Sequence, residues 1–158
     1  MVALPQQGGC PCGAVRLTLA AAPLLAYVCH CHDCQKRSGS AFTLTLVAGA
    51  ADVLRSGPTR VKRHAMRSGR QIDQSSCATC GHRVLAPPPV APDFVSFPAG
   101  VLDDASWMRP IAQTWVESAI PWAVIPGVRS VAWEDFDFAS LGREWRATAP
   151  RFGVANGE

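Results

Sequence analysis

The seven cysteines of this 158-residue chain fall into three tight clusters, and cysteine thiolates are favoured ligands of zinc in proteins. The clusters read Cys10-Pro11-Cys12, Cys29-His30-Cys31-His32-Asp33-Cys34 and Cys77-Ala78-Thr79-Cys80-Gly81. Two complete four-cysteine sites would need eight thiols, and the chain has seven. The counts therefore predict one zinc closed by four thiolates, which holds structure, and a second held by three, with a position left open for a substrate.

The first and last clusters each have the form of half a metal site. Cys77 and Cys80 are separated by two residues and followed by glycine, which permits the unusual backbone angle of a tight metal-binding turn. Such a turn needs a second pair of ligands, and Cys10 and Cys12, also followed by glycine, are the pair that remains. We therefore expect a structural zinc on all four. A redox dithiol is the alternative for the last pair, and the five other thiols disfavour it.

The middle cluster offers three thiols within six residues, and three such ligands can cover one face of a metal ion. We favour an open, substrate-binding zinc, held by Cys29, Cys31 and Cys34. Two alternatives stay open: a disulfide, or a second structural zinc completed by His30, His32 or Asp33. Because His30 lies between two ligand cysteines, an extended backbone would point it away from the metal, and we expect it beside the site.

Strand patterns surround these clusters and must position them. Apolar and polar residues alternate over residues 15–20 and 42–47, as in half-buried strands. Further strand candidates are residues 24–29, 52–55, 60–65, 70–76, 83–86, 94–98, 111–116 and 131–137. Only residues 32–37 and 139–146 have helical patterns, and the proline triplet at 87–89 indicates a rigid turn. The pattern predicts a mainly β fold of antiparallel sheets with little helix, in a single domain over residues 1–148 with a loose tail at 149–158.

Composition points to an ordinary soluble domain. Hydrophobic residues make up 48% and charged residues 17% of the chain, and the net charge of +3 is too small to indicate nucleic-acid binding. The first residues lack the basic start and apolar run of a secretory signal, and the most apolar stretch, residues 17–28, is too short to span a bilayer. We expect a cytoplasmic protein with reduced thiols and no nucleic-acid or membrane partner. The oligomeric state stays open.

The order of the motifs resembles the glutathione-dependent formaldehyde-activating enzyme family, which also includes a vertebrate centromere protein. The resemblance covers about residues 8–122. It rests on the segments Gly8-Gly9-Cys10-x-Cys12-Gly13-Ala14-Val15-Arg16, Cys29-His30-Cys31-x-x-Cys34-Gln35-Lys36, Ser38-Gly39-Ser40-Ala41-Phe42 and Cys77-x-x-Cys80-Gly81, with weaker support from Leu102-Asp103-Asp104 and Ala119-Ile120-Pro121-Trp122.

The resemblance implies a β-tent fold with two zinc ions per chain. It assigns Cys10, Cys12, Cys77 and Cys80 to a structural zinc, and Cys29, Cys31 and Cys34 to a catalytic one. The implied activity is that of a carbon–sulfur lyase resembling S-(hydroxymethyl)glutathione synthase, which joins glutathione to formaldehyde or a related small aldehyde. This chain departs from the family where members often carry histidine after Pro110, because its nearest equivalent is Gln113.

Two further predictions concern the substrate and the rival function. Glutathione carries two carboxylates, and arginine can hold a carboxylate through two hydrogen bonds, so Arg16, Lys36, Arg37 and the arginines at 55–70 are candidate anchors. The alternative function is a non-enzymatic, zinc-stabilised binding module that carries glutathione or grips a protein partner. A labile second zinc would favour the enzyme, and two inert zincs would favour the module.

Overall fold

The computed structural model describes residues 1–86 and 93–154, and strands dominate this part of the chain. The strands are β1 (Val2–Leu4), β2 (Gln6–Gly9), β3 (Arg16–Leu19), β4 (Leu25–Cys29), β5 (Thr43–Gly49), β6 (Val53–Ser56), β7 (Thr59–Ala65), β8 (Gln71–Cys77), β9 (Arg83–Leu85), β10 (Phe94–Pro98), β11 (Ala112–Thr114), β12 (Arg129–Val131) and β13 (Phe152–Val154). The two α-helices are α1 (His32–Ser38) and α2 (Phe138–Thr148). The predicted mainly β fold with little helix is confirmed.

The described strands form one large sheet and three small ones. The large sheet has the order β10-β5-β4-β11-β12, and two three-stranded sheets have the orders β2-β3-β6 and β7-β8-β9. Both small three-stranded sheets are antiparallel, as predicted. The prediction of antiparallel pairing fails at three places, because β11 runs parallel to both β4 and β12, and β1 runs parallel to β13.

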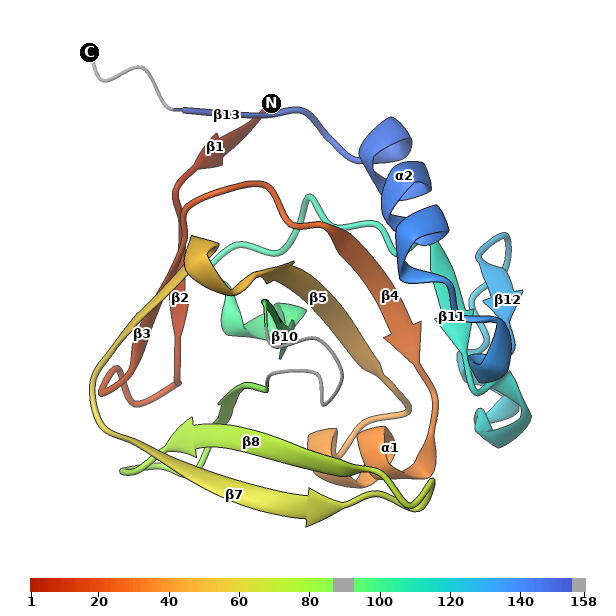
Figure 1. Cartoon of the computed structure of the whole chain (residues 1–158), viewed down its shortest axis with the longest axis horizontal. Coiled ribbons are helices and arrows are strands. Elements are labelled where there is room, and N and C mark those ends of the chain that lie inside the picture. The colour runs from red at the N-terminus through yellow and green to blue at the C-terminus, as the bar shows by residue number, and fades with distance from the viewer. Residues whose placement is uncertain (87–92, 155–158) are drawn as a thin grey trace.

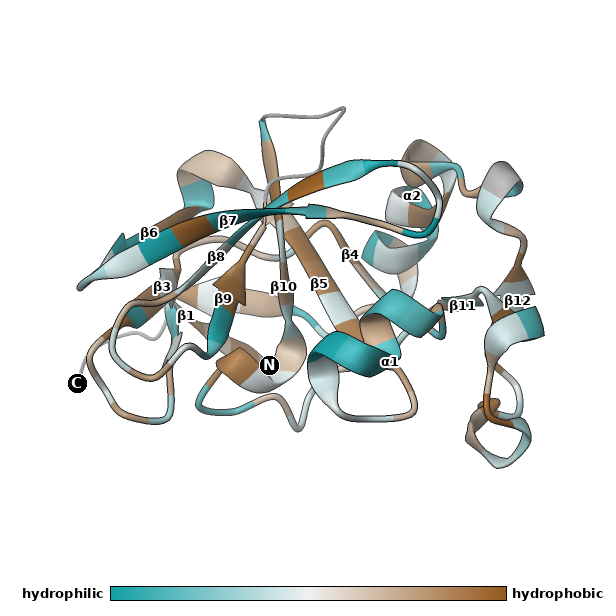
Figure 2. Ribbon diagram, turned by 90° about the horizontal axis from the view of Figure 1, so that it is seen from below, coloured by the Kyte–Doolittle hydropathy of each residue, from teal (hydrophilic) through white to brown (hydrophobic). Residues whose placement is uncertain are grey.

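The sheets face one another in the manner of a β-tent. In Figure 1, β7 and β8 lie across the interior from β4 and β5, with α1 at one end of the space between them. The helix α2 lies outside this space, along β4. Figure 2 shows apolar colouring on β5 and β9 in the interior and hydrophilic colouring on α1 and much of β7.

Two groups of buried side chains stabilise the fold. The larger one fills the space around the central strands β4 and β5 and includes Leu25, Leu46 and Trp145. Trp145 comes from α2 and is 1% exposed, and its indole Nε1 donates a hydrogen bond to the Pro23 carbonyl oxygen at 3.1 Å. The smaller group lies between the two three-stranded sheets and consists of Cys10, Val15, Leu17, Cys77, Val84 and Val101.

Three segments differ from the sequence-based expectations. Residues 131–137, predicted as a strand, instead contain the end of β12 and a short 3-10 helix at Trp133–Asp135. The strands β1 and β2 were not predicted. Within the described residues 149–154 the expected loose tail is wrong, because β13 pairs with β1 and Phe152 packs edge-on against Trp107 with ring centroids 5.2 Å apart. The proline triplet at 87–89 lies outside the described residues. No helix in the described ranges is long and apolar enough to cross a membrane.

Candidate functional site

The first and last cysteine clusters meet, as the spacing predicted. Cys10 and Cys12 lie in the turn between β2 and β3, and Cys77 and Cys80 lie where β8 turns into β9. All four Sγ atoms are within 4.8 Å of one another, with Cys10–Cys12 at 3.4 Å and Cys12–Cys77 at 3.8 Å. Sulfurs at the corners of a tetrahedron with Zn–S bonds near 2.3 Å lie about 3.8 Å apart. The four thiols therefore have the spacing of a metal site and are too far apart for disulfides.

The two turns that carry these thiols are built alike. Gly13 and Gly81 have φ angles of +77° and +76°, which glycine adopts without a Cβ clash. Each donates its backbone N–H to the first cysteine of its pair, with Gly13 N to Cys10 O and Gly81 N to Cys77 O both at 3.0 Å. Hydrogen bonding from the backbone N–H of Cys80 lowers the pKa of the buried Cys77 thiol to about 6. A thiol that ionises readily suits metal binding.

The middle cluster also gathers its three thiols, at the junction between β4 and α1. Cys29 ends β4, Cys31 is the N-cap of α1, and Cys34 lies in the first turn of this helix. Their Sγ atoms lie within 4.8 Å of one another, and no histidine or carboxylate of the described residues joins them as a fourth ligand. The Cys31 Sγ accepts a hydrogen bond from the Cys34 backbone N–H at 3.4 Å. The three cysteines could hold a metal ion and leave one position open.

The electrostatic surroundings of this cluster favour a negatively charged sulfur. Hydrogen bonds from the Cys29 and Cys31 thiols, with help from the nearby Arg37 cation, hold the pKa of Cys34 far below its usual value. The same coupling raises the pKa of Cys29, which is buried. The Arg37 Nη2 atom lies 3.8 Å from the Cys34 Sγ atom.

The three-cysteine cluster opens onto a cavity of about 290 Å³ between the opposed sheets. One wall comes from β4, β5 and β10, and the other from β8, β9 and the turn before β8. Cys29, Cys31 and Cys34 lie at the α1 end of this cavity. Its lining is unusually rich in two kinds of side chain. The arginines are Arg37, Arg67, Arg70 and Arg83, and the aromatic residues are Tyr27, Phe97, Trp115, Trp133 and Phe138.

None of the four cavity arginines forms an ion pair among the described residues, and Arg37 and Arg83 are the two that are partly buried. Arg37 has buried Nε and Nη1 atoms without any hydrogen-bond partner. Arg83 forms no ion pair within residues 1–86 and 93–154, and burial together with the nearby Arg37 cation lowers the pKa of its guanidinium. A partly buried cation is costly unless an anion accompanies it, and here Arg37 faces only the Cys34 sulfur at 3.8 Å, while Arg83 has no ion-pair partner in the described ranges. These two guanidinium groups therefore suit an anionic ligand beside the thiols.

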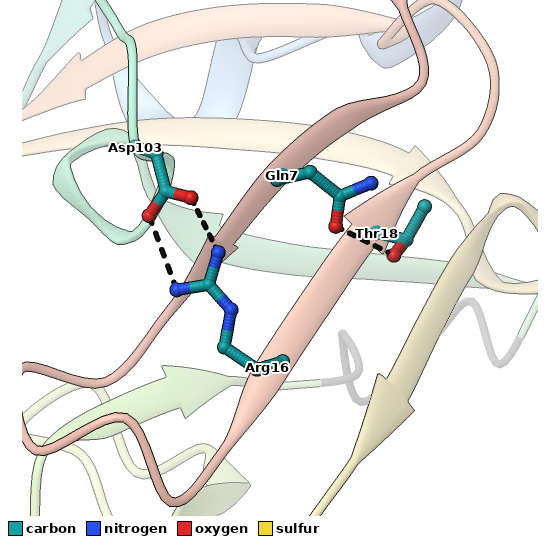
Figure 3. A network of polar contacts seen from close by, with 4 residues as sticks. All are labelled: Gln7, Arg16, Thr18 and Asp103. Atoms are coloured by element: carbon teal, nitrogen blue, oxygen red, sulfur yellow. Dashed lines mark hydrogen bonds and ion pairs between the residues drawn. The ribbon is translucent and has the colours of Figure 1, made fainter.

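The predicted carboxylate anchors divide into two groups. Arg37, Arg67 and Arg70 line the cavity, whereas Arg16 pairs through both terminal nitrogens with Asp103 beside the β2–β3 strands (Figure 3). Lys36 is exposed and does not line the cavity, and neither do Arg55, Arg60 and Arg63. Sequence reasoning missed Arg83, although its place three residues after Cys80 could have marked it as close to a metal-binding turn.

His30 is fully buried and lies beside the three-cysteine cluster rather than in it. Its Nε2 atom is 3.2 Å from Gln113 Oε1, and its ring packs edge-on against Phe42. Gln113 also accepts a hydrogen bond from the Ile125 backbone N–H and donates to the Ile125 and Val128 carbonyl oxygens, at 2.9–3.0 Å. Gln113 therefore joins the loop before β12 to His30, the residue between two of the cysteines.

A glutathione-dependent formaldehyde-activating enzyme model matches residues 5–118, which is most of the chain. The chain belongs to this family. The matched part contains all seven cysteines, Arg37 and Arg83. A search of curated proteins finds no match. Among solved structures, the crystal structure of a Rhodobacter sphaeroides protein is similar at 20% identity and a TM-score of 0.48, over 61% of this chain and 87% of that chain.

Proposed function

We propose that this protein is a zinc-dependent carbon–sulfur lyase of the formaldehyde-activating type, which joins the glutathione thiol to a small aldehyde. The observation that carries the proposal is the composition of one cavity. Three thiols that could hold a metal from one side share it with four arginines, none of which forms an ion pair within residues 1–86 and 93–154. Family membership supports the same substrates.

The residues fit two zinc ions with different roles. Cys10, Cys12, Cys77 and Cys80 would close a structural site, because their sulfurs have near-tetrahedral spacing and tie two sheets together. Cys29, Cys31 and Cys34 would hold the second ion and leave a position facing the cavity. When bound, this zinc keeps a coordinated substrate thiol ionised and polarises a carbonyl oxygen.

Arg37 and Arg83 would hold and orient glutathione. The tripeptide carries two carboxylates, and arginine binds carboxylate more strongly when both are shielded from water. The cations lie close to Cys34, so a carboxylate bound to them would bring the substrate thiol to the α1 end of the cavity.

The reaction itself is an addition that needs no redox partner. A carbon–sulfur bond forms between the thiol and the aldehyde carbon, the carbonyl π bond breaks, and the thiol proton ends on the former carbonyl oxygen. Because this addition also proceeds without a catalyst, product alone is no proof of catalysis. The discriminating quantity is the rate of exchange between free aldehyde and adduct, above the uncatalysed rate.

Exchange NMR with glutathione and formaldehyde measures that rate at equilibrium. The zinc-loaded protein should accelerate the exchange, and Cys31→Ser should remove the acceleration while keeping the fold. If the wild-type protein binds glutathione without raising the exchange rate for formaldehyde or for benzaldehyde, the protein is a binding module and the enzymatic proposal is refuted.

A second variant tests the anchor. Arg83→Gln should raise the glutathione Kd about tenfold or more in calorimetry, because a hydrogen bond to a charged group typically contributes at least that factor to binding. The Kd for uncharged 2-mercaptoethanol should stay unchanged. Arg16→Gln is the matched control, because Arg16 pairs with Asp103 outside this cavity. Equal losses for both thiols would contradict the anchoring role.

A further inference from the structure

One wall of the cavity is aromatic and consists of Trp115, Trp133 and Phe138. Only part of this wall comes from the residues that match the family. Trp115 lies within the matched residues, but Trp133 and Phe138 come from the segment after residue 118. This segment is fixed to the body of the protein through α2, whose buried Leu141 and Trp145 belong to the main core. A chain segment outside the shared motifs therefore shapes the substrate cavity.

The rings of the aromatic wall pack against one another and against neighbouring side chains. Trp133 stacks on Trp115 with ring centroids 6.2 Å apart and on Phe136 with centroids 5.3 Å apart, at interplanar angles of 23° in both cases. The Arg70 guanidinium carbon lies 4.2 Å from the centre of the Trp133 ring. Phe138 packs edge-on against Phe136 with centroids 5.1 Å apart. A wall fixed in this way loses little conformational entropy when a ligand binds.

The backbone at Trp115 is strained, which marks this residue as more than packing. Its φ and ψ angles are 58° and 40°, in the left-handed region, and within residues 1–86 and 93–154 no other non-glycine residue has positive φ. A bulky residue in this region costs on the order of 1–2 kcal/mol. Such outliers cluster at binding sites, where the strain directs a side chain to a needed position. Here the strain accompanies an indole that lines the cavity.

The lining of the cavity, more than its volume of about 290 Å³, bears on the aldehyde, because glutathione occupies part of the same space. Formaldehyde is little larger than water and presents no apolar surface for three aromatic rings to cover. The arginines beside Cys34 suit the carboxylates of glutathione, whereas the aromatic wall suits an organic group on the aldehyde.

We propose that the aldehyde substrate carries an aromatic group, which binds against Trp115, Trp133 and Phe138. This inference rests on the proposed function and names its second substrate. The glutathione sulfur bonds to the aldehyde carbon, the carbonyl π bond breaks, and the thiol proton ends on the oxygen, giving an aryl thiohemiacetal. The aromatic group then lies on the wall while Arg37 and Arg83 hold the peptide part.

Two stable conjugates that differ only at this group provide the test. S-Benzylglutathione and S-methylglutathione share the peptide, so the ratio of their Kd values isolates the aromatic contact. In calorimetry with the zinc-loaded protein, S-benzylglutathione should bind about tenfold or more tightly, as expected for added apolar groups in a matching pocket. Trp133→Leu, which keeps an apolar side chain, should reduce the ratio to less than about threefold.

The control and the outcomes separate this inference from the proposed function. Trp122→Leu removes a tryptophan that is 78% exposed and outside the cavity, and should keep the wild-type ratio. Equal affinity for the two conjugates in the wild-type protein would overturn the aromatic substrate and leave glutathione binding intact. If Trp133→Leu has the same ratio of Kd values as the wild-type protein, the aromatic group does not bind against the wall that contains Trp133. Failure of both conjugates and of glutathione to bind would overturn the proposed function together with this inference.

Discussion

Replacing Cys77 with serine should destabilise the whole domain, because this cysteine joins two parts of the chain that are distant in sequence. Its Sγ atom lies 3.8 Å from that of Cys12, and 65 positions separate the two residues. A metal held by both acts as a cross-link between the turn after β2 and the turn after β8. Cys77 is fully buried among Val15, Leu17 and Val84, so its loss also disturbs the smaller core.

The cost of losing the Cys77 cross-link follows from its loop length. In the chain-entropy model, a cross-link that closes a 65-residue loop stabilises the folded state by about 4 kcal/mol at 25 °C. A buried serine hydroxyl without a partner adds about 1–3 kcal/mol of destabilisation. Domains are typically stable by only about 5–15 kcal/mol, so Cys77→Ser removes a large part of the total.

Cys31→Ser is the matched control, since it makes the same chemical change in the other cluster. The three middle cysteines close a loop of only about five residues, for which the same model gives about 2 kcal/mol. Cys31 is the N-cap of α1 and accepts the Cys34 N–H, and serine is itself a favoured N-cap. This variant should therefore lose its second metal ion and keep most of its stability.

Urea unfolding of the two zinc-loaded variants, with metal content measured by elemental analysis, provides the comparison. With an m-value of about 2–3 kcal/mol/M, Cys77→Ser should lower the unfolding midpoint by about 2 M, and Cys31→Ser by less than about 1 M. If Cys31→Ser lowers the midpoint as much as Cys77→Ser, the division into a structural and an open site is refuted.

Three further predictions address the surroundings of the site. Gln113→Leu should cost about 3 kcal/mol in calorimetric unfolding, because it leaves Ile125 and its neighbours without hydrogen-bond partners; an unchanged Tm would contradict this role. Trp115→Gly should have a free energy of unfolding in urea about 1 kcal/mol higher than that of Trp115→Ala. Both variants lack the indole, but only alanine has a Cβ atom that disfavours the left-handed backbone conformation, so equal stability of the two variants would argue against strain at this position. The Arg63 guanidinium lowers the pKa of Asp73 in the folded protein. Their interaction therefore stabilises the fold at pH values above the ordinary aspartate pKa, and this stabilisation is lost as the pH falls through the lowered pKa. The stability advantage of the wild-type protein over Asp73→Asn should accordingly be constant from about pH 7 to about pH 5 and shrink as the pH falls below about 4, and an advantage independent of pH would exclude this linkage.

The metal-binding geometry could be predicted from the sequence because cysteine spacing is a local and chemically restrictive signal. Two thiols two residues apart, followed by glycine, leave few alternatives to a metal-binding turn, and the Cys10 and Cys77 pairs do meet in space. Most strands could also be predicted, since alternation of apolar and polar residues reports directly on which face is buried. The strand β10 has the predicted bounds, residues 94–98.

The cavity wall could not be predicted in the same way, because it depends on contacts between distant segments. Trp133 lies in a stretch whose β-branched and aromatic residues indicated a strand, yet its backbone forms a short 3-10 helix that stacks the ring on Trp115. The strands β1 and β13 were missed because each has only three residues and is stabilised mainly by pairing with the other. Arg83 stands between His82 and the apolar run Val84-Leu85-Ala86, a pattern that does not distinguish a residue facing a cavity from one facing solvent.

The distance in sequence between the two halves of the four-cysteine cluster also has a consequence during protein synthesis. At about 5–20 residues per second, the ribosome needs roughly 3–13 s to extend the chain by the 65 positions that separate Cys12 from Cys77. During this interval Cys10 and Cys12 have emerged without their partners, whereas Cys29, Cys31 and Cys34 emerge almost together. The nascent chain can therefore complete its three-thiol cluster first, and the cluster that joins the sheets forms only after β8 has been made.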